Sequence, residues 1–178
     1  MKKIILFLLL ITSLYADAKV YMGVSGGYLN ESVSNDESTS ASSETAKFKI
    51  GYGQREAYAV EFSIDYIKNE TTIFSTTGED SDKIGMNVEL VKSFDWDIYI
   101  IPYFKAGFGS GTFDIKSDDG DSINYGSFNL GLGFFVPINE HFDFEVGYDY
   151  KYVSYEEISD TQLNSHMNGA YAGFNVRF

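Results

Sequence analysis

The side chains best suited to acid–base chemistry are the two histidines, His141 and His166. Ser165 directly precedes His166, and the carboxylates of Glu156 and Glu157 lie a short distance before it in the chain. A nucleophile, a base and a carboxylate need only meet in space to activate the hydroxyl, so these residues form a candidate catalytic group. A solvated loop histidine is the simpler interpretation of His166, and the sequence therefore predicts no catalytic residue.

Four aspartates surround Gly120 and suggest an oxygen-ligand calcium site: Asp114, Asp118, Asp119 and Asp121. An EF-hand needs alternating ligands and a bidentate Glu at its twelfth position, and counting from Asp114 that position holds Tyr125. We therefore expect a solvated acidic turn, with a loose external Ca²⁺ site as the alternative. The chain has no Cys, zinc spacing, phosphate loop or dinucleotide fingerprint, so neither a metal nor a cofactor is predicted.

The first residues of the chain have the composition of a secretory signal peptide. Lys2 and Lys3 form a basic start, residues 4–15 are mostly apolar, and residues 16–18 (Ala-Asp-Ala) fit a cleavage site. We therefore expect residues 1–18 to be removed and residues 19–178 to form one domain. The apolar run is shorter than the roughly 20 residues of a membrane-spanning helix, and no later segment has 18 consecutive apolar residues. A mature chain that enters a membrane must therefore cross it with strands.

Eight strands are predicted to position the candidate residues, because alternation with a period of two dominates the mature chain. In the clearest strand, Tyr58, Val60 and Phe62 share one face, while Glu61 and Asp65 share the other. One face of the sheet is therefore apolar, and the other mixes charge with glycine. The predicted strands cover residues 20–29, 46–53, 57–67, 83–94, 98–113, 125–135, 142–153 and 168–178.

The expected connections alternate in length and polarity. Long polar segments cover residues 30–45, 69–82, 114–124 and 154–165, and short turns cover residues 54–56, 95–97 and 136–140. Long loops on one rim and short turns on the other are typical of bacterial outer-membrane barrels with both termini in the periplasm. The four long segments carry 15 acidic residues, which we expect on the external rim. The whole chain has 26 acidic and 13 basic residues, a balance that argues against nucleic acid as a partner.

The charged face of the strands is expected to line the interior of the barrel. An eight-stranded barrel is just wide enough for side chains to fill it, and buried charges are tolerated only when they are paired. We interpret the interior as a plug of salt bridges that Asn87, Asn129 and Tyr171 complete, with Glu89 or Glu145 as the partner of Lys105. A narrow conduit in which the pairs exchange partners is the alternative. The predicted interior charges are Lys47, Lys49, Lys105, Lys151 and Arg177 against Glu61, Asp65, Glu89, Asp143, Glu145 and Asp149.

Aromatic residues make up 17% of the chain, and their placement predicts two girdles at the membrane interfaces. The alternative is that they form the core of a soluble barrel or sandwich. The girdle at the short turns would hold Tyr52, Tyr58, Phe94, Trp96, Phe134, Phe142 and Phe178, and the girdle at the long loops would hold Tyr28, Tyr66, Phe108, Tyr150 and Tyr152.

Two motifs resemble those of small outer-membrane barrels. The end of the chain resembles the Gly-x-x-apolar-x-apolar signature that the barrel-assembly machinery reads on its substrates, with Gly173, Val176 and Phe178 at the signature positions. Residues 102–109 (Pro-Tyr-Phe-Lys-Ala-Gly-Phe-Gly) resemble the Pro-Tyr-x-x-Ala-Gly-x-Gly stretch of opacity-protein, surface-antigen and OmpA membrane-domain barrels. The resemblance implies an all-β, eight-stranded antiparallel transmembrane barrel in the bacterial outer membrane. Unlike full-length OmpA-type proteins, the chain stops at the last strand, so no tether to the cell wall is expected.

The two motifs say little about activity, and we expect a structural or surface-interaction role, like that of an adhesin or antigen, rather than catalysis. The expected partners are outer-membrane lipids, lipopolysaccharide, the barrel-assembly machinery and an external surface ligand, and the expected state is a monomer. Three alternatives remain open: a narrow solute or ion channel, a lipid A-modifying enzyme, and a secreted lipocalin-like protein whose apolar face turns inward. Outer-membrane deacylases use a His-x-Ser pair, a spacing that Ser165 and His166 do not match.

Overall fold

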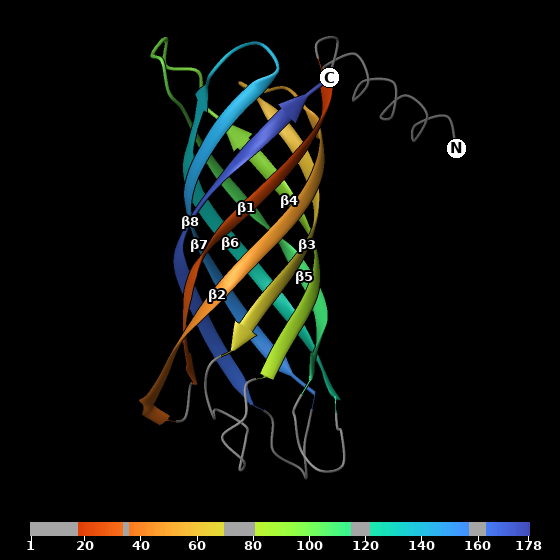
Figure 1. Ribbon diagram of the computed structural model, residues 1–178, viewed down its shortest axis with the longest axis vertical. Coiled ribbons are helices and arrows are strands. Elements are labelled where there is room, and N and C mark those ends of the chain that lie inside the picture. The colour runs from red at the N-terminus through yellow and green to blue at the C-terminus, as the bar shows by residue number, and fades with distance from the viewer. Residues whose placement is uncertain (1–17, 34–35, 70–80, 115–121, 157–162) are drawn as a thin grey trace, which may run out of the picture.

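The chain folds into a closed antiparallel barrel of eight strands, as the computed structural model shows for residues 18–33, 36–69, 81–114, 122–156 and 163–178 (Figure 1). Each strand pairs with its neighbours in sequence, and β8 closes the barrel by pairing with β1. The predicted fold class is therefore confirmed. None of the described residues forms a helix long and apolar enough to cross a membrane. The strands are β1 (Lys19–Val33), β2 (Asp36–Gly53), β3 (Tyr58–Asn69), β4 (Ser81–Ser93), β5 (Ile101–Asp114), β6 (Ser122–Pro137), β7 (Phe142–Tyr155) and β8 (Asn164–Arg177).

The short connections all lie at one end of the barrel, together with the end of β8 and the start of β1 (top of Figure 1). Following the arrangement expected from the sequence, we call this end the periplasmic end and the opposite end the external end. The connection between β4 and β5 is longer than predicted, because β5 begins at Ile101 rather than at residue 98. Asp97 has a φ angle of 56°, a left-handed conformation that interrupts an extended strand. The Asp95 carboxylate accepts a hydrogen bond of 3.0 Å from the Asp97 backbone N–H and thereby holds this turn.

The first hairpin corrects the prediction of a loop over residues 30–45. β1 continues to Val33 and β2 begins at Asp36, with Leu29 opposite Ser43 and Glu31 opposite Ala41. The segment is rich in Ser, Asp and Glu and has few apolar residues, a composition that indicated a loop, but cross-strand backbone hydrogen bonds do not require apolar side chains. Of the other three long segments, residues 70–80, 115–121 and 157–162 lie outside the described residues, and β8 begins at Asn164 rather than at residue 168. The hairpin therefore carries the sheet well beyond the predicted strand ends.

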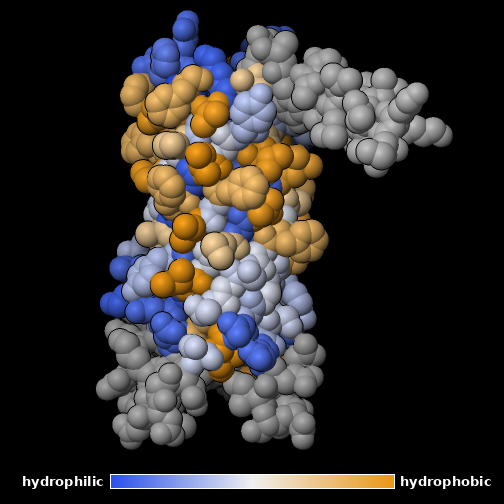
Figure 2. Space-filling view, turned by 90° about the vertical axis from the view of Figure 1, so that its right-hand side faces the viewer, coloured by the Kyte–Doolittle hydropathy of each residue, from blue (hydrophilic) through white to orange (hydrophobic). Residues whose placement is uncertain are grey.

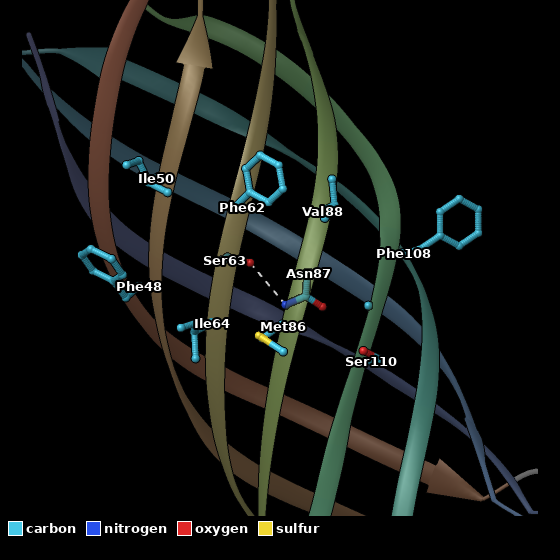
Figure 3. Close-up of a pocket in the computed structure, with 11 residues that line it drawn as sticks. Phe48, Ile50, Phe62, Ser63, Ile64, Met86, Asn87, Val88, Phe108 and Ser110 are labelled. Carbon is cyan, nitrogen blue, oxygen red and sulfur yellow. Dashed lines mark hydrogen bonds between the residues drawn. The ribbon is translucent and has the colours of Figure 1, made fainter.

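An apolar belt covers the outer wall of the barrel (Figure 2). Large apolar side chains point outward from every strand, as do most of the aromatic residues predicted for the girdles. Towards the external end the outward positions become polar, as at Asn30, Glu44 and Asn124. The apolar side chains of β2–β5 also border a shallow groove of about 600 Å³ (Figure 3). Because the apolar face points outward, the alternative of a lipocalin-like calyx is wrong.

Apolar and glycine residues shape the interior at its two ends. One buried cluster, at the end with the short turns, contains Tyr21, Ala59, Val91, Ile101, Tyr103 and Phe135. The other, at the opposite end, contains Leu29, Ile67, Phe113, Ile123, Tyr125, Val153, Tyr155 and Met167. Inward glycines make room for the large side chains, since a Cβ atom at Gly51 would overlap the ring of Tyr21. The polar residues of the interior lie mainly between these clusters.

Candidate functional site in the barrel lumen

The first layer of the lumen, next to the buried cluster around Tyr21 and Phe135, is centred on Glu145. The ammonium of Lys49 lies 2.5 Å from Glu145 and 3.2 Å from Glu61. The hydroxyls of Tyr103 and Tyr171 donate hydrogen bonds of 2.8 Å and 2.9 Å to the other oxygen of Glu145. All five side chains are buried, so β2, β3, β5, β7 and β8 are connected through one carboxylate.

The second layer is centred on Asp149, which two lysines share. Lys47 lies 2.8 Å from one oxygen of Asp149, and Lys105 lies 3.0 Å from the other. Lys105 also lies 3.9 Å from Glu89. Glu89 and Glu145 were the two expected partners of Lys105. Glu89 is a distant partner, whereas Glu145 pairs with Lys49 instead. Asp149 is the principal partner of Lys105.

The third layer combines one ion pair with a chain of amides. Lys151 pairs with Asp65 and also donates a hydrogen bond of 3.2 Å to the Asn87 carbonyl oxygen. The amide of Asn129 donates to the same oxygen at 2.8 Å, and the amide of Asn87 donates to Ser63 at 3.2 Å (Figure 3). The amide chain thus extends the ion pair from β7 to β6, β4 and β3.

A further ion pair lies at the external end of the lumen and was missed in the sequence. The Lys83 ammonium lies 2.5 Å from Glu31, and it sits over the ring of Phe113 at 4.8 Å. Tyr155 and Ser165 donate hydrogen bonds of 2.7 Å and 2.6 Å to the second oxygen of Glu31. Both charged residues have odd numbers in strands whose odd positions face inward. That signal could have identified Glu31 if β1 had been extended beyond residue 29.

Another group lies at the periplasmic mouth, where Asp143 lies between two arginines. The Nε of Arg177 donates to Asp143 at 2.5 Å, and Nη2 of Arg55 lies 3.0 Å from the other Asp143 oxygen. The same nitrogen of Arg55 donates to the backbone oxygens of Asn139 and Glu140, both at 3.0 Å. Arg55 therefore joins the β2–β3 turn to the β6–β7 turn. The sequence analysis did not identify Arg55, because the alternation of side chains along a strand does not predict the direction of a side chain in a turn.

The structure does not assemble the candidate catalytic group. Ser165 faces the lumen and donates to Glu31, whereas His166 faces outward, where its Nδ1 lies 2.6 Å from the Tyr150 hydroxyl. Glu156 accepts a hydrogen bond of 3.0 Å from Asn124, and Glu157 lies outside the described residues. His141 is exposed near the periplasmic turn between β6 and β7.

The candidate calcium loop falls largely outside the described residues. Asp114 is exposed at the end of β5, but Asp118, Asp119 and Asp121 are not described. Within the described ranges, no group of three or more His, Cys, Asp or Glu residues is placed to hold a metal ion.

The candidate assembly signal lies on the strand that closes the barrel. Gly173 faces the lumen opposite Ser25 on β1, and Val176 pairs with Met22 on the outer wall. The ring of Phe178 is exposed, and its backbone N–H donates a hydrogen bond of 2.9 Å to Val20. The terminal aromatic thus extends the outer wall at the periplasmic end.

Comparison with known proteins identifies the family. The chain matches the outer membrane protein beta-barrel domain over residues 4–178. It belongs to this family. The protein is therefore an outer-membrane β-barrel, and the expected location in the bacterial outer membrane is confirmed. No curated protein matches the chain significantly.

Solved structures with a similar fold include Neisserial surface protein A (NspA), at a TM-score of 0.68 and 18% identity, covering 90% of this chain and 99% of that one. Ail, the attachment invasion locus protein of Yersinia pestis, in complex with the heparin analogue sucrose octasulfate, has a TM-score of 0.56 and 16% identity, covering 90% and 99%. The outer membrane enzyme PagL has a TM-score of 0.52 and 15% identity, covering 88% and 99%. At these identities the likeness concerns the fold.

Proposed function

We propose that this outer-membrane barrel is a surface-interaction scaffold whose lumen is plugged by salt bridges. The observation that carries the proposal is the pairing of the lumen charges. Each of the nine residues Lys47, Lys49, Glu61, Asp65, Glu89, Lys105, Glu145, Asp149 and Lys151 makes an ion pair, and the longest measures 3.9 Å.

The free volume beside the central ion pairs supports a plug rather than a conduit. The cavity beside Lys47, Asp65, Asp149 and Lys151 has a volume of only about 10 Å³, which corresponds to about one water molecule. A conduit would require these paired charges to separate, and separating a buried pair leaves charges without compensation. The barrel is therefore proposed to act through its surface.

Planar-bilayer recording tests the plug. The wild-type protein should show no large, stable conductance, because paired side chains fill its interior. Lys105→Ala should weaken the layer around Asp149, and Lys68→Ala, on the outward face of β3, is the matched control outside the lumen. A stable open state in the wild type would contradict the plug and favour the narrow channel. Conductance that is present only in Lys105→Ala would favour a gate.

The external rim is proposed to make the surface interactions, as expected of a rigid scaffold with variable connections. Of the 15 carboxylates in the four polar segments, Glu31 is turned into the lumen, whereas Glu44, Asp114 and Glu156 are exposed. A rim of this charge repels the phosphates of lipopolysaccharide unless divalent cations bridge them. This expectation of cation-dependent binding differs from the Ail structure, in which the bound molecule is the heparin analogue sucrose octasulfate.

Cell or matrix binding by protein-coated beads tests this role. Binding should require Ca²⁺ or Mg²⁺ and should fall when EDTA is added, while Na⁺ at equal ionic strength should not replace the divalent ion. Glu44→Gln with Asp114→Asn should weaken binding, and Ser42→Ala with Thr112→Ala is the neutral control on the same strands. Unchanged binding in EDTA would contradict the cation-bridged rim.

The remaining expectations concern biogenesis. We propose that residues 1–18 are a cleaved signal peptide and that Gly173, Val176 and Phe178 are read by the barrel-assembly machinery, giving a monomeric barrel. Phe178→Ser should reduce outer-membrane levels in cells, yet leave refolding in detergent nearly intact, because the backbone hydrogen bond to Val20 does not need the ring. Normal outer-membrane levels of Phe178→Ser would contradict an assembly signal.

A lipid A-modifying activity is not favoured, although the enzyme PagL shares the fold. The hydroxyl of Ser165 and the ring of His166 lie on opposite faces of β8. A serine and a histidine on opposite faces of a strand cannot act as nucleophile and base. The proposed role therefore remains interaction rather than catalysis.

A further inference from the structure

The periplasmic mouth concentrates one residue type that the rest of the protein does not use. The chain contains two arginines, Arg55 and Arg177, and both contact Asp143. Every other cation of the lumen is a lysine. Arginine differs from lysine in its planar fork of N–H groups, which matches a carboxylate with two parallel hydrogen bonds.

The two guanidinium groups are not saturated by the contacts around Asp143. Arg177 Nη1 and Arg55 Nε are buried, and neither has a hydrogen-bond partner among the described residues. Arg177 is only 3% exposed, and its guanidinium is held over the ring of Tyr21 at 4.6 Å. Buried N–H groups without partners are rare in native structures and call for an explanation.

A cavity adjoins these groups. It has a volume of about 410 Å³ and is lined by both arginines, by Lys19, and by the carboxylate residues Glu56, Asp95 and Glu140. This volume is within the usual range for a small-molecule site. Positive and negative side chains line the same cavity, so it offers partners to both ends of a zwitterion.

We propose that the periplasmic mouth binds a small zwitterionic ligand, namely a short peptide with a free amino end and a free carboxyl end. The carboxylate pairs with the guanidinium groups of Arg55 and Arg177, which line the cavity. The ammonium is placed among Glu56, Asp95 and Glu140. The short turns face the periplasm in barrels of this kind, so the ligand is a periplasmic one. The site is separate from the external rim, and its existence does not depend on the surface role proposed above.

The presence of two arginines gives a direct experiment. Full-length mature protein in nanodiscs, labelled with ¹⁵N-arginine, should give two side-chain Nε–Hε signals, which Arg55→Lys would assign. Three probes separate the charges: glycylglycine carries both, N-acetylglycine carries the carboxylate, and glycinamide carries the ammonium. Both signals should shift saturably with glycylglycine, and N-acetylglycine should bind more weakly. Glycinamide should leave both signals in place.

Two variants make the result specific. Arg55→Lys keeps the charge but removes the fork, so it should weaken glycylglycine binding at least tenfold, read from the Arg177 signal. Lys92→Gln removes a positive charge from the same end of the barrel but outside the cavity, and should change the dissociation constant less than twofold. Saturable shifts absent at tens of millimolar glycylglycine, or equal shifts with glycinamide or sodium chloride, would overturn the proposal. Unchanged binding in Arg55→Lys would overturn the role of the fork.

Discussion

Each end of the lumen holds a buried carboxylate paired with a cation, but the two ends differ in how many of their hydrogen-bonding groups have partners. At the external end, Glu31 accepts from Lys83, Tyr155 and Ser165, and the lysine is fully buried. At the periplasmic end, Asp143 has two cationic partners, but each arginine retains an N–H without a hydrogen-bond partner among the described residues, beside a cavity. Both ends place a cation against aromatic rings.

This difference suggests different roles for the two ends: the external pair closes the lumen, and the periplasmic group binds a ligand. A carboxylate that is saturated by protein groups has no capacity left for a ligand, and the surrounding apolar cluster excludes water. An unsaturated arginine pair at an open mouth retains hydrogen-bonding capacity. We therefore expect the external pair to contribute mainly to stability and the periplasmic group to contribute less to stability and more to recognition.

The strongest test of this contrast is Lys83→Met. It leaves Glu31 buried without its counter-ion, and breaking a buried pair in this way costs about 3–5 kcal/mol. Urea unfolding of the refolded barrel in vesicles, followed by tryptophan fluorescence and by heat modifiability on gels, measures the loss. The double variant Glu31→Gln/Lys83→Met removes both charges and should recover most of it. A loss below about 1 kcal/mol for the single variant would show that the external pair is not a seal.

Arg177→Gln should have an intermediate effect. Asp143 loses a charged hydrogen bond, worth roughly 1.5–3 kcal/mol, but it keeps the contact with Arg55. The same unfolding measurement applies, and Arg177→Lys separates the charge from the fork. If Arg177→Gln destabilised the barrel as much as Lys83→Met, the proposed difference between the two ends would not hold.

Arg55→Gln should change stability least, by at most about 1 kcal/mol, as expected of a partly solvated pair. Its side chain is 19% exposed, and the two turns that it joins are each held by their own strands. Unfolding should therefore be nearly unchanged, while the glycylglycine-induced shift of the Arg177 signal is lost. If Arg55→Gln caused a large loss of stability but no loss of glycylglycine binding, the periplasmic group would serve stability rather than recognition, and the proposed contrast would be wrong.

The alternation of side chains along each strand predicted which side chains face the lumen, but it could not predict how they pair. Lys49, Glu61 and Glu145 fall at inward positions because side chains alternate along a strand. The 2.5 Å contact between Lys49 and Glu145 joins β2 to β7, 96 residues apart, and depends on the tilt and register of the closed barrel. Alternation likewise does not distinguish Asp149 from Glu145 as the ion-pair partner of Lys105.

The ends of the barrel were predicted less well than its middle, for two physical reasons. Glu31 lies in a polar stretch whose composition favours a loop, yet pairing with β2 keeps it extended. Arg55 lies in a turn, where alternation has no meaning, and its contact with Asp143 depends on how two distant turns meet. Both errors arose where the closed sheet, rather than the local sequence, determines the conformation.

The extension of β1 and β2 beyond the apolar belt affects how a partner can be bound. In this hairpin the backbone register is continuous from Lys19↔Gly53 to Ser32↔Ser40. The conformational entropy of these residues is therefore lost when the barrel folds, before any partner arrives. A ligand that contacts the hairpin meets a preorganised surface and does not have to order it, a saving that raises affinity without adding contacts.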